Sequence, residues 1–440
     1  MATARSLALR ALVALERGRS ERLKPELDGH GLEGRDLAFA YELSHGVLRR
    51  QRLLDHVLTG FAHRGLPKDP QLKVALRMGV HQLLFVAGMP AHAAVNETVA
   101  LVKSNRGFAN AMLRHVAAAV ASRPADDAKP TTELALAPER TFVCPNALPD
   151  DEVARLAIVH SLPDWLVQRF HAEHGVDGVR RIAAAASATP GIFLRCSRDV
   201  TRATLQEELA AADVQTEPCE HERLLRWTGG DSPFGTAPFR VGRFVVQDPT
   251  ALAAAEAVPV EAGDTVIDLC AAPGTKTTWL GEQVGDGGRV FAFDPDAPRR
   301  ARIVDNAERL RLEQIVTVVD DVAALPHDAD AVLADVPCSN SGVLGRRVEA
   351  RRRLTPETFT ELAELQRQLL RQALAATRPG GHVVYSTCSI DRDENAAVVA
   401  AVLAEDGAPP SELLREHVTL PLAGQHDGGY FAVLRRREVR

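Results

Sequence analysis

The sequence predicts a multidomain protein with an all-α N-terminal region, a small α+β segment and a C-terminal α/β domain built on a doubly wound, mainly parallel sheet. Three observations lead to this fold class. The chain has 440 residues, which at roughly 100–200 residues per domain suggests two to four domains. Apolar residues recur at helical spacing up to about residue 120. From about residue 246, short apolar strands alternate with helices, as in parallel sheets with helical crossovers.

The first expected domain, residues 1–120, is helical throughout. Its apolar residues recur at intervals of three and four, and glycines and prolines separate the stretches. The clearest sets are Leu72, Leu76, Val80, Leu83 and Leu84, and later Phe108, Met112 and Val116.

Charge divides the chain unevenly. Residues 1–120 hold 17 Lys and Arg against 10 Asp and Glu, whereas the remainder holds 35 against 48. A basic module joined to an acidic one suggests an anionic partner, such as nucleic acid, although a surface that is basic only for solubility remains the alternative. Candidate phosphate contacts are Arg49, Arg50, Arg52 and Arg114.

The middle of the chain is less regular. Residues 121–145 are rich in alanine, proline and small polar residues and are expected to be a linker. Residues 146–245 are expected to form a small α+β segment, with a strand at Gly191–Ser197 and a helix at Leu205–Ala211.

The last expected domain, residues 246–440, carries polar or reactive groups after every strand. Strands are expected at 266–269, 290–293, 316–319, 331–334 and 382–385. In such sheets, ligands bind beyond the carboxyl ends of the strands. The residues at these ends are Cys270, Ala271, Ala272, Pro273, Gly274, Thr275, Lys276, Asp294, Asp320, Asp321, Asp335, Cys338 and Cys388.

Three cofactors compete for the first of these loops. A dinucleotide site needs G-x-G-x-x-G, and a phosphate-binding P-loop needs glycine where Thr275 stands before Lys276, so both matches fail. S-adenosyl-L-methionine remains. Its methionine part could approach the backbone of a tight turn. Asp294, 26 residues after Asp268, could accept hydrogen bonds from its ribose.

Two strand-end cysteines are candidate reactive groups. Cys338 and Cys388 stand beside prolines, serines and threonines, although buried cysteines without a chemical role are the simpler alternative. A thiolate that adds to carbon 6 of cytosine makes carbon 5 nucleophilic, and a carboxyl group in a dry site can stabilise charge at ring nitrogen 3. The pair together with Asp335 meets these needs.

Other classes find no support in the sequence. There is no C-x-x-C pair and no H-x-x-x-H pattern, so no metal is expected. No run of 18 apolar residues exists, and the N-terminus resembles an amphipathic helix rather than a signal peptide, so a cytoplasmic monomer without a membrane partner is expected.

The motifs also resemble a known family. IDLCAAPGTKT, DVPCSNSGVL and YSTCSIDRDEN resemble the cofactor loop, Pro-Cys motif and Thr-Cys motif of the RNA 5-methylcytosine methyltransferases. The stretch PAHAAVNETVALVKSNRGFANAMLRHV resembles the RNA-binding antitermination factor NusB. The combination is similar to RsmB-type enzymes that act on 16S ribosomal RNA, and the likeness covers nearly the whole chain.

This resemblance implies roles for individual residues. Cys388 would be the nucleophile, Cys338 would assist breakdown of the covalent adduct, and Asp335 would contact ring nitrogen 3. Cys270 through Lys276, Asp294, Asp321 and Asp335 would border S-adenosylmethionine. The implied partner is RNA, most specifically small-subunit ribosomal RNA, bound by residues 1–120 and 146–245.

The sequence departs from the family pattern in places and leaves alternatives open. Thr275 replaces a usual glycine, and the run from Arg346 to Arg353, which is expected to contact RNA phosphate, replaces R-H-P-D. The alternatives are a transfer RNA cytosine-5 methyltransferase and a non-catalytic RNA-binding factor in ribosome assembly.

Overall fold

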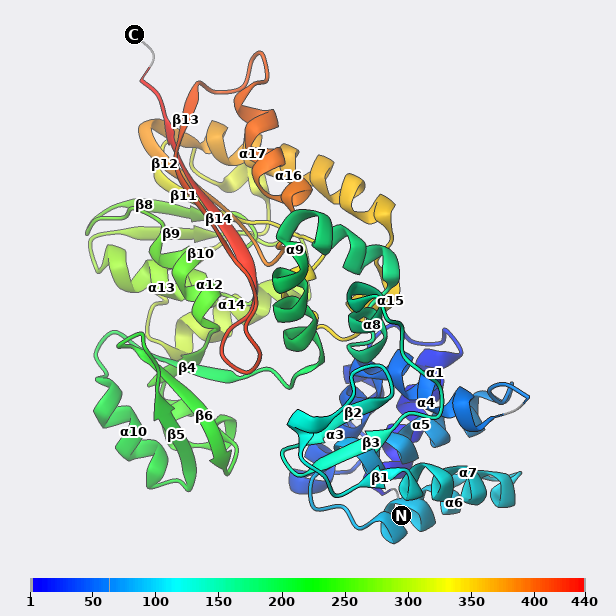
Figure 1. Ribbon diagram of the computed structural model, residues 1–440. Coiled ribbons are helices and arrows are strands. Elements are labelled where there is room, and N and C mark those ends of the chain that lie inside the picture. Colours follow the sequence, from blue (N-terminus) through cyan, green and yellow to red (C-terminus); the bar gives the residue numbers. More distant parts are fainter. Residues whose placement is uncertain (1–2, 63, 439–440) are drawn as a thin grey trace. The chain divides into compact units, whose positions relative to one another are not determined.

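The computed structural model describes residues 3–62 and 64–438, and the chain separates into two compact units. The first unit runs from the N-terminus to Ala188 and also includes Arg347–Arg353. The second contains Thr189–Arg346 and the chain from Leu354 onward. Figure 1 follows this order by colour, from blue to red.

The expected N-terminal helices are present in the first unit (Figure 1). They are α1 (Ala4–Glu16), α2 (Leu23–Leu27), α3 (Gly34–Arg49), α4 (Gln51–Phe61), α5 (Pro70–Phe85), α6 (Ala91–Leu101) and α7 (Arg106–Ala118). Local signals fix several ends. Thr3 and Ser6 form a capping box at α1, and the Asp69 carboxylate accepts from the first backbone N–H groups of α5, which has Pro70 at its first position.

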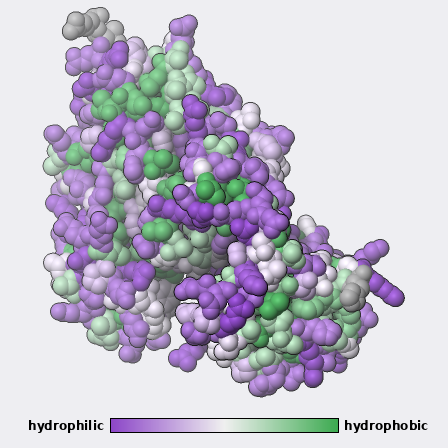
Figure 2. Space-filling view, in the orientation of Figure 1, coloured by the Kyte–Doolittle hydropathy of each residue, from purple (hydrophilic) through white to green (hydrophobic). Residues whose placement is uncertain are grey.

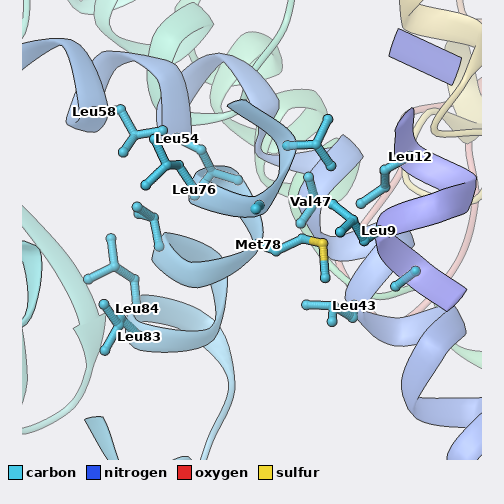
Figure 3. Close-up of a cluster of buried hydrophobic side chains, with 14 of the residues drawn as sticks. Leu9, Leu12, Leu43, Val47, Leu54, Leu58, Leu76, Met78, Leu83 and Leu84 are labelled. Atoms are coloured by element: carbon cyan, nitrogen blue, oxygen red, sulfur yellow. The ribbon is translucent and has the colours of Figure 1, made fainter. Parts of the chain in front are cut away.

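Leucine-rich helix faces build one core in this unit. Leucine and valine side chains of α1, α3, α4 and α5 converge in Figure 3, where Leu43, Leu54 and Leu76 are each 0% exposed. The apolar face expected between Leu72 and Leu84 is buried. The apolar face expected from Phe108 to Val116 is only partly buried. Met112 and Val116 are buried, but Phe108 is 43% exposed, because the buried face of α7 continues through Ala109 instead.

The segment expected to be a linker, residues 121–145, contains secondary structure. Strands β1 (Val120–Ala121), β2 (Glu133–Ala137) and β3 (Arg140–Val143) form an antiparallel sheet in the order β1-β3-β2. Helices α8 (Glu152–Val159) and α9 (Asp164–Ser187) follow. The linker prediction was wrong here, because few residues of these strands are buried: β1 has no buried residue and β2 has one of five, so no apolar pattern marks them.

The second unit begins with a small antiparallel sheet in the order β5-β6-β4-β7. The strand and helix expected in this region are both present, as β4 and α10. The elements are β4 (Ile192–Cys196), α10 (Arg202–Ala210), β5 (Val214–Pro218), β6 (Leu224–Gly230), α11 (Ala237–Arg240) and β7 (Phe244–Val246).

The larger sheet has the order β10-β9-β8-β11-β12-β14-β13, and its first five strands are parallel. All five are strands that the sequence predicts. The elements are α12 (Pro249–Glu256), β8 (Thr265–Asp268), α13 (Thr275–Val284), β9 (Arg289–Ala292), α14 (Ala297–Arg309), β10 (Val316–Val318), β11 (Ala329–Asp335), α15 (Ala350–Arg353), α16 (Pro356–Ala376), β12 (Thr377–Thr387), α17 (Ala396–Leu403), β13 (Ser411–Thr419) and β14 (Gly429–Arg436).

Helices cover both faces of this sheet (Figure 1). Successive residues of a strand point to opposite faces. Val266 accordingly packs in the core under α12, α13 and α14, whereas Ile267 packs in the core under α16 and α17. The observed Rossmann-like α/β architecture confirms the predicted fold class.

Two antiparallel strands extend the sheet beyond the sequence-based prediction. β14 pairs with β12, and β13 forms the outer edge. Hydrophobic side chains gather over β13 in Figure 2, where Leu413, Leu414 and Val418 are exposed. Across residues 3–62 and 64–438, no helix is long and apolar enough to cross a membrane.

Candidate functional site

The loop from Leu269 to Gly274 turns the chain from β8 into α13. Gly274 has a φ of 97°, in the left-handed region, and a Cβ there would lie 3.1 Å from the Cα of Ile303. Thr275 is the first residue of α13 and does not have a positive φ. The glycine that the family pattern has at position 275 is therefore not required by the backbone of this loop.

The end of β9 holds this loop in place. Asp294, 1% exposed, accepts hydrogen bonds from the backbone N–H groups of Ala272 at 3.3 Å and Asp296 at 3.0 Å. The N–H of Ala271 donates to the carbonyl of Phe293 at 2.9 Å. Asp294 and the cofactor loop are thus joined by hydrogen bonds at neighbouring strand ends, as expected from their places after consecutive strands.

A buried carboxylate below the loop is incompletely bonded. Thr277 donates to Asp268 Oδ2 at 2.7 Å, whereas the buried Oδ1 has no hydrogen-bond partner within residues 3–62 and 64–438. Burial raises the pKa of Asp268 to about 7, and burial also raises the pKa of the nearby Cys270 thiol. A ligand bearing an amine and ribose hydroxyls fits this acceptor-rich turn, so the loop is suited to S-adenosylmethionine.

Asp321 stands at the end of β10, next to β9 in the sheet. It is exposed, and its carboxylate accepts from the N–H of Ala323 at 2.9 Å, capping a short 3₁₀ helix (Val322–Ala324). The neighbouring Asp320 is exposed as well. Asp321 and Asp294 are therefore at the carboxyl ends of adjacent parallel strands.

Lys276 and Asp335 form an ion pair across two strand ends. The Nζ of Lys276 lies 2.6 Å from Asp335 Oδ2, and Ser386 donates to Asp335 Oδ1 at 3.0 Å. Burial alone would lower the pKa of Lys276, but the adjacent Asp335 carboxylate outweighs it and raises that pKa. The pair places the Lys276 ammonium beside the carboxyl end of the sheet.

The two candidate cysteines are in direct contact. Cys338 Sγ lies 3.0 Å from Cys388 Sγ, and Cys388 Sγ lies 3.5 Å from Asn340 Oδ1. The hydrogen bond with Cys388, followed by burial, raises the pKa of Cys338 well above its usual range. Cys338 is therefore held as a neutral thiol.

Three of the predicted residues line one cavity of about 120 Å³: Lys276, Asp335 and Cys388. The wall also includes Thr250, Tyr430 and Phe431. Cys338 reaches this cavity only through its contact with Cys388. Cys270, Asp294 and Asp321 belong to the adjoining strand ends and do not line it.

A partly buried charge cluster beside the cavity includes two acids, Asp248 and Asp427, that the sequence analysis did not single out. Asp248 accepts from the N–H of Thr250 at 3.0 Å and of Asp427 at 3.1 Å, while Arg346 Nε lies 2.8 Å from Asp427 Oδ2. Burial, followed by the charge of Asp427, raises the pKa of Asp248 to about 7. The only sequence signal was Asp248 before Pro249, a helix-start pattern.

The run from Arg346 to Arg353 was expected to contact RNA phosphate, but not all of its arginines are free to do so. Arg346 pairs with Asp427, and Arg351 is 6% exposed and donates to backbone carbonyls of the first unit. The prediction of a phosphate contact was therefore wrong for the buried Arg351, and it stays a prediction for the partly exposed Arg346. Arg352 and Arg353 are exposed.

Of the four arginines proposed as phosphate contacts in the first unit, three are buried or contact other side chains and one is exposed. Arg49 is 7% exposed, the guanidinium of Arg50 lies 4.4 Å from the Phe85 ring centroid, and Arg52 pairs with Asp164 at 2.8 Å. Arg114 is exposed on α7 and stays a candidate phosphate contact.

Comparison with known proteins identifies both parts of the chain. Residues 255–422 match the family model described as 16S rRNA methyltransferase RsmB/F, and residues 2–118 match the NusB family. The chain is 32% identical over 391 residues to the probable ribosomal RNA small subunit methyltransferase B of Synechocystis, covering 86% of this chain and 83% of that protein. It is 31% identical to ribosomal RNA small subunit methyltransferase B of Thermus thermophilus, covering 99% and 98%.

Solved structures show the same fold. The crystal structure of a methyltransferase homolog protein from Pyrococcus horikoshii has a TM-score of 0.57 at 23% identity and covers 66% of this chain and 100% of that one. The matched relatives extend over nearly the whole sequence, and the cofactor loop and strand-end residues lie together as the methyltransferase motifs require. The chain therefore belongs to the ribosomal RNA small subunit methyltransferase B family of S-adenosylmethionine-dependent methyltransferases.

Proposed function

We propose that this protein methylates carbon 5 of a cytosine in 16S ribosomal RNA through a covalent adduct with Cys388. The observation that carries the proposal is one small cavity that holds Cys388, Lys276 and Asp335, with Cys338 in contact with Cys388. At about 120 Å³ the cavity is well below the ~300–1,000 Å³ of pockets for drug-sized ligands, which suits a single flipped base.

The first step is attack by the Cys388 thiolate on carbon 6 of the base. The sulfur–carbon bond forms, the carbon 5–carbon 6 double bond opens, and electron density moves towards ring nitrogen 3. Asp335 contacts that nitrogen, and the Lys276 ammonium, 2.6 Å from Asp335 Oδ2, stabilises the negative charge that develops on the base. The Lys276 ammonium also offsets the negative charge of the thiolate in the same cavity.

Cys338 acts after methyl transfer. The adduct must lose the hydrogen on carbon 5 as a proton, which passes to a solvent water molecule. Cys388 is then expelled as the ring double bond is restored, and its sulfur takes up the proton of the Cys338 thiol, which regains one from solvent. Cys338 lies close enough to Cys388 to assist this elimination. Because Cys338 is held as a thiol, Cys388 is the better placed of the two to begin the reaction.

The cofactor supplies an electrophilic methyl group for carbon 5. Cys270 through Lys276 would border it with backbone groups, and Asp294 and Asp321 would accept hydrogen bonds from its nucleoside part. The unpartnered Oδ1 of Asp268 offers a further acceptor beneath this loop. These residues bind and orient, and none needs to transfer a proton.

The choice of RNA rests on the relatives and the domain combination. The curated relatives are named as methyltransferases of small-subunit ribosomal RNA. Residues 1–120 and 146–245 would bind RNA, as the basic charge of the first region favours. The proposal also includes a monomeric protein and action in the cytoplasm.

Covalent trapping tests the assignment of the two cysteines. We expect Cys388→Ala to abolish methyl transfer and Cys338→Ala to accumulate an RNA–protein complex that survives denaturing electrophoresis. Cys219→Ala serves as the control, because Cys219 is a partly buried thiol outside the cavity. Normal turnover by Cys388→Ala would overturn the assignment.

Bisulfite sequencing tests the substrate. We expect one cytosine of 16S ribosomal RNA to lose protection in a strain that lacks the gene, and to regain it when the wild-type gene is restored. Loss in a transfer RNA instead would keep the chemistry and replace the substrate. No change in any RNA, with the protein expressed, would favour a non-catalytic RNA-binding factor.

A further inference from the structure

A single buried carboxylate connects the segments that carry the two cysteines. Glu394 lies in a 3₁₀ helix (Arg392–Glu394) between β12 and α17 and is 0% exposed. It accepts from the backbone N–H of Ser339 at 2.8 Å and from the hydroxyls of Ser339 and Ser389, each at 2.5 Å. Ser339 follows Cys338 directly, and Ser389 follows Cys388 directly.

A side chain from α16 completes the arrangement. The amide of Gln366 donates to Glu394 at 3.1 Å and to the carbonyl of Pro337 at 2.9 Å. Pro337 is the residue before Cys338, so the Pro-Cys segment is held on both sides of its cysteine. Glu394 is thus the common acceptor of the Pro-Cys segment, the Thr-Cys segment and the helix beneath them.

Burial of a carboxylate is costly unless hydrogen bonds satisfy it. Every donor that contacts Glu394 in the described part of the chain is neutral: two serine hydroxyls, one backbone amide and one glutamine amide. Burial raises the pKa of Glu394, and the hydrogen bonds from these donors oppose that shift because they favour the charged form. A strong, directional set of contacts therefore fixes two segments that are 50 residues apart in sequence.

We propose that Glu394 is a positioning residue that holds Cys338 and Cys388 in register, so that one thiol can resolve the adduct that the other forms. This inference rests on the proposed covalent mechanism. Glu394 also contributes, by its negative charge, to keeping Cys338 protonated.

The test variant is Glu394→Gln, which keeps the shape but replaces one of the two accepting oxygens by an NH₂ group. Misplacement of a reacting group by about 1 Å can cost on the order of 10²-fold in rate. We expect kcat to fall by about that factor, with KM for RNA and the Kd of S-adenosylmethionine unchanged, and covalent RNA adduct to accumulate on Cys388.

Glu405→Gln is the matched control, because Glu405 lies just beyond α17 and pairs with Arg371, away from both cysteines. Ser339→Ala and Ser389→Ala each remove one hydroxyl donor to Glu394 and keep the inference testable if Glu394→Gln does not fold. Each serine variant should show a smaller fall in kcat and a detectable adduct.

Two results would overturn the inference. One is normal turnover by Glu394→Gln. The other is loss of turnover without adduct, in variants that still bind S-adenosylmethionine. Cys338→Ala, measured in parallel, separates this failure from failure of the proposed function: if Cys338→Ala also gives no adduct, the covalent mechanism itself is wrong.

Discussion

At the scale of single residues, some groups of the site can be predicted from the sequence and others cannot. Cys388 follows β12 directly, Asp335 is the last residue of β11, and Lys276 lies in the first turn of the helix after β8. Parallel strands end at one edge of a sheet, so the meeting of these residues in one cavity is predictable. Asp248 and Asp427 contact each other across 179 residues of sequence. The residues around Asp248 and Asp427 do not indicate this contact. The entropic cost of closing a loop rises only slowly with its length, so residues far apart in sequence can meet.

Asp268 gives a prediction about pH. Its pKa in the folded protein is raised to about 7 by burial. The folded state therefore holds a proton that the unfolded state has lost between about pH 4 and pH 7, so the free energy of unfolding falls as pH rises through this window. From that shift, the loss contributed by Asp268 amounts to about 4 kcal/mol.

Asp268→Asn should remove this contribution. Urea unfolding of the cofactor-free protein at pH 5 and pH 7 should show a smaller difference for the variant than for the wild type. Asp286→Asn, at an exposed position, is the control. An unchanged difference in Asp268→Asn would show that Asp268 does not retain its proton in the folded state.

At the scale of elements, a buried charge network ties the small sheet to the helix after the cofactor loop. Arg195 on β4 is 0% exposed and lies 2.8 Å from Glu282 of α13, and Arg223 lies 2.6 Å from the same oxygen. Both guanidinium groups stack on Trp279 of α13, at 5.2 and 4.8 Å from the ring centroid. The orientation of α13 thus depends on the small sheet.

Removal of one partner from a buried pair leaves an under-compensated charge, which costs about 3–5 kcal/mol. Arg195→Met should destabilise the second unit by about that amount, measured by urea unfolding with tryptophan fluorescence. Arg226→Met removes an exposed pair with Glu217 and should cost less than about 1 kcal/mol. Equal losses in the two variants would rule out a special role for the buried network.

Element prediction succeeded where burial imposes a pattern. The five parallel strands are short apolar runs between helices, and each is present. β13 escaped because most of its side chains are exposed at the sheet edge, which leaves no apolar alternation to detect. The sheet β1–β3 escaped for a related reason, because β1 has no buried residue and β2 has only one.

At the scale of the whole molecule, one short segment belongs to a different unit from the residues on either side of it in the sequence. Residues Arg347–Arg353 lie in sequence between β11 and α16, yet they belong to the first unit. Val348 is 0% exposed in the core of that unit, and Glu349 accepts from the N–H of Leu23 at 3.0 Å. A charged run in a loop predicts a solvated surface, so only the three-dimensional structure could show this.

Arg351 explains how such a segment is held. It donates to the carbonyls of Arg49 at 3.0 Å, His160 at 3.3 Å and Ala186 at 2.7 Å, which lie at the C-terminal ends of α3, α8 and α9. These ends have carbonyls without helical partners and a partial negative charge, so a cation stabilises them. Burial still lowers the pKa of Arg351 to about 9.

Arg351→Met should therefore destabilise the first unit, because three helix ends lose a charged donor whose hydrogen bonds contribute about 1.5–3 kcal/mol each. We expect faster amide exchange in α3, α8 and α9 of the full-length protein, with exchange in β8–β12 unchanged. Arg352→Met, at an exposed position one residue away, should leave all of these rates as in the wild type. Faster exchange throughout both units in Arg351→Met would mean that they unfold as one, and unchanged exchange would mean that the segment only rests on the first unit without stabilising it.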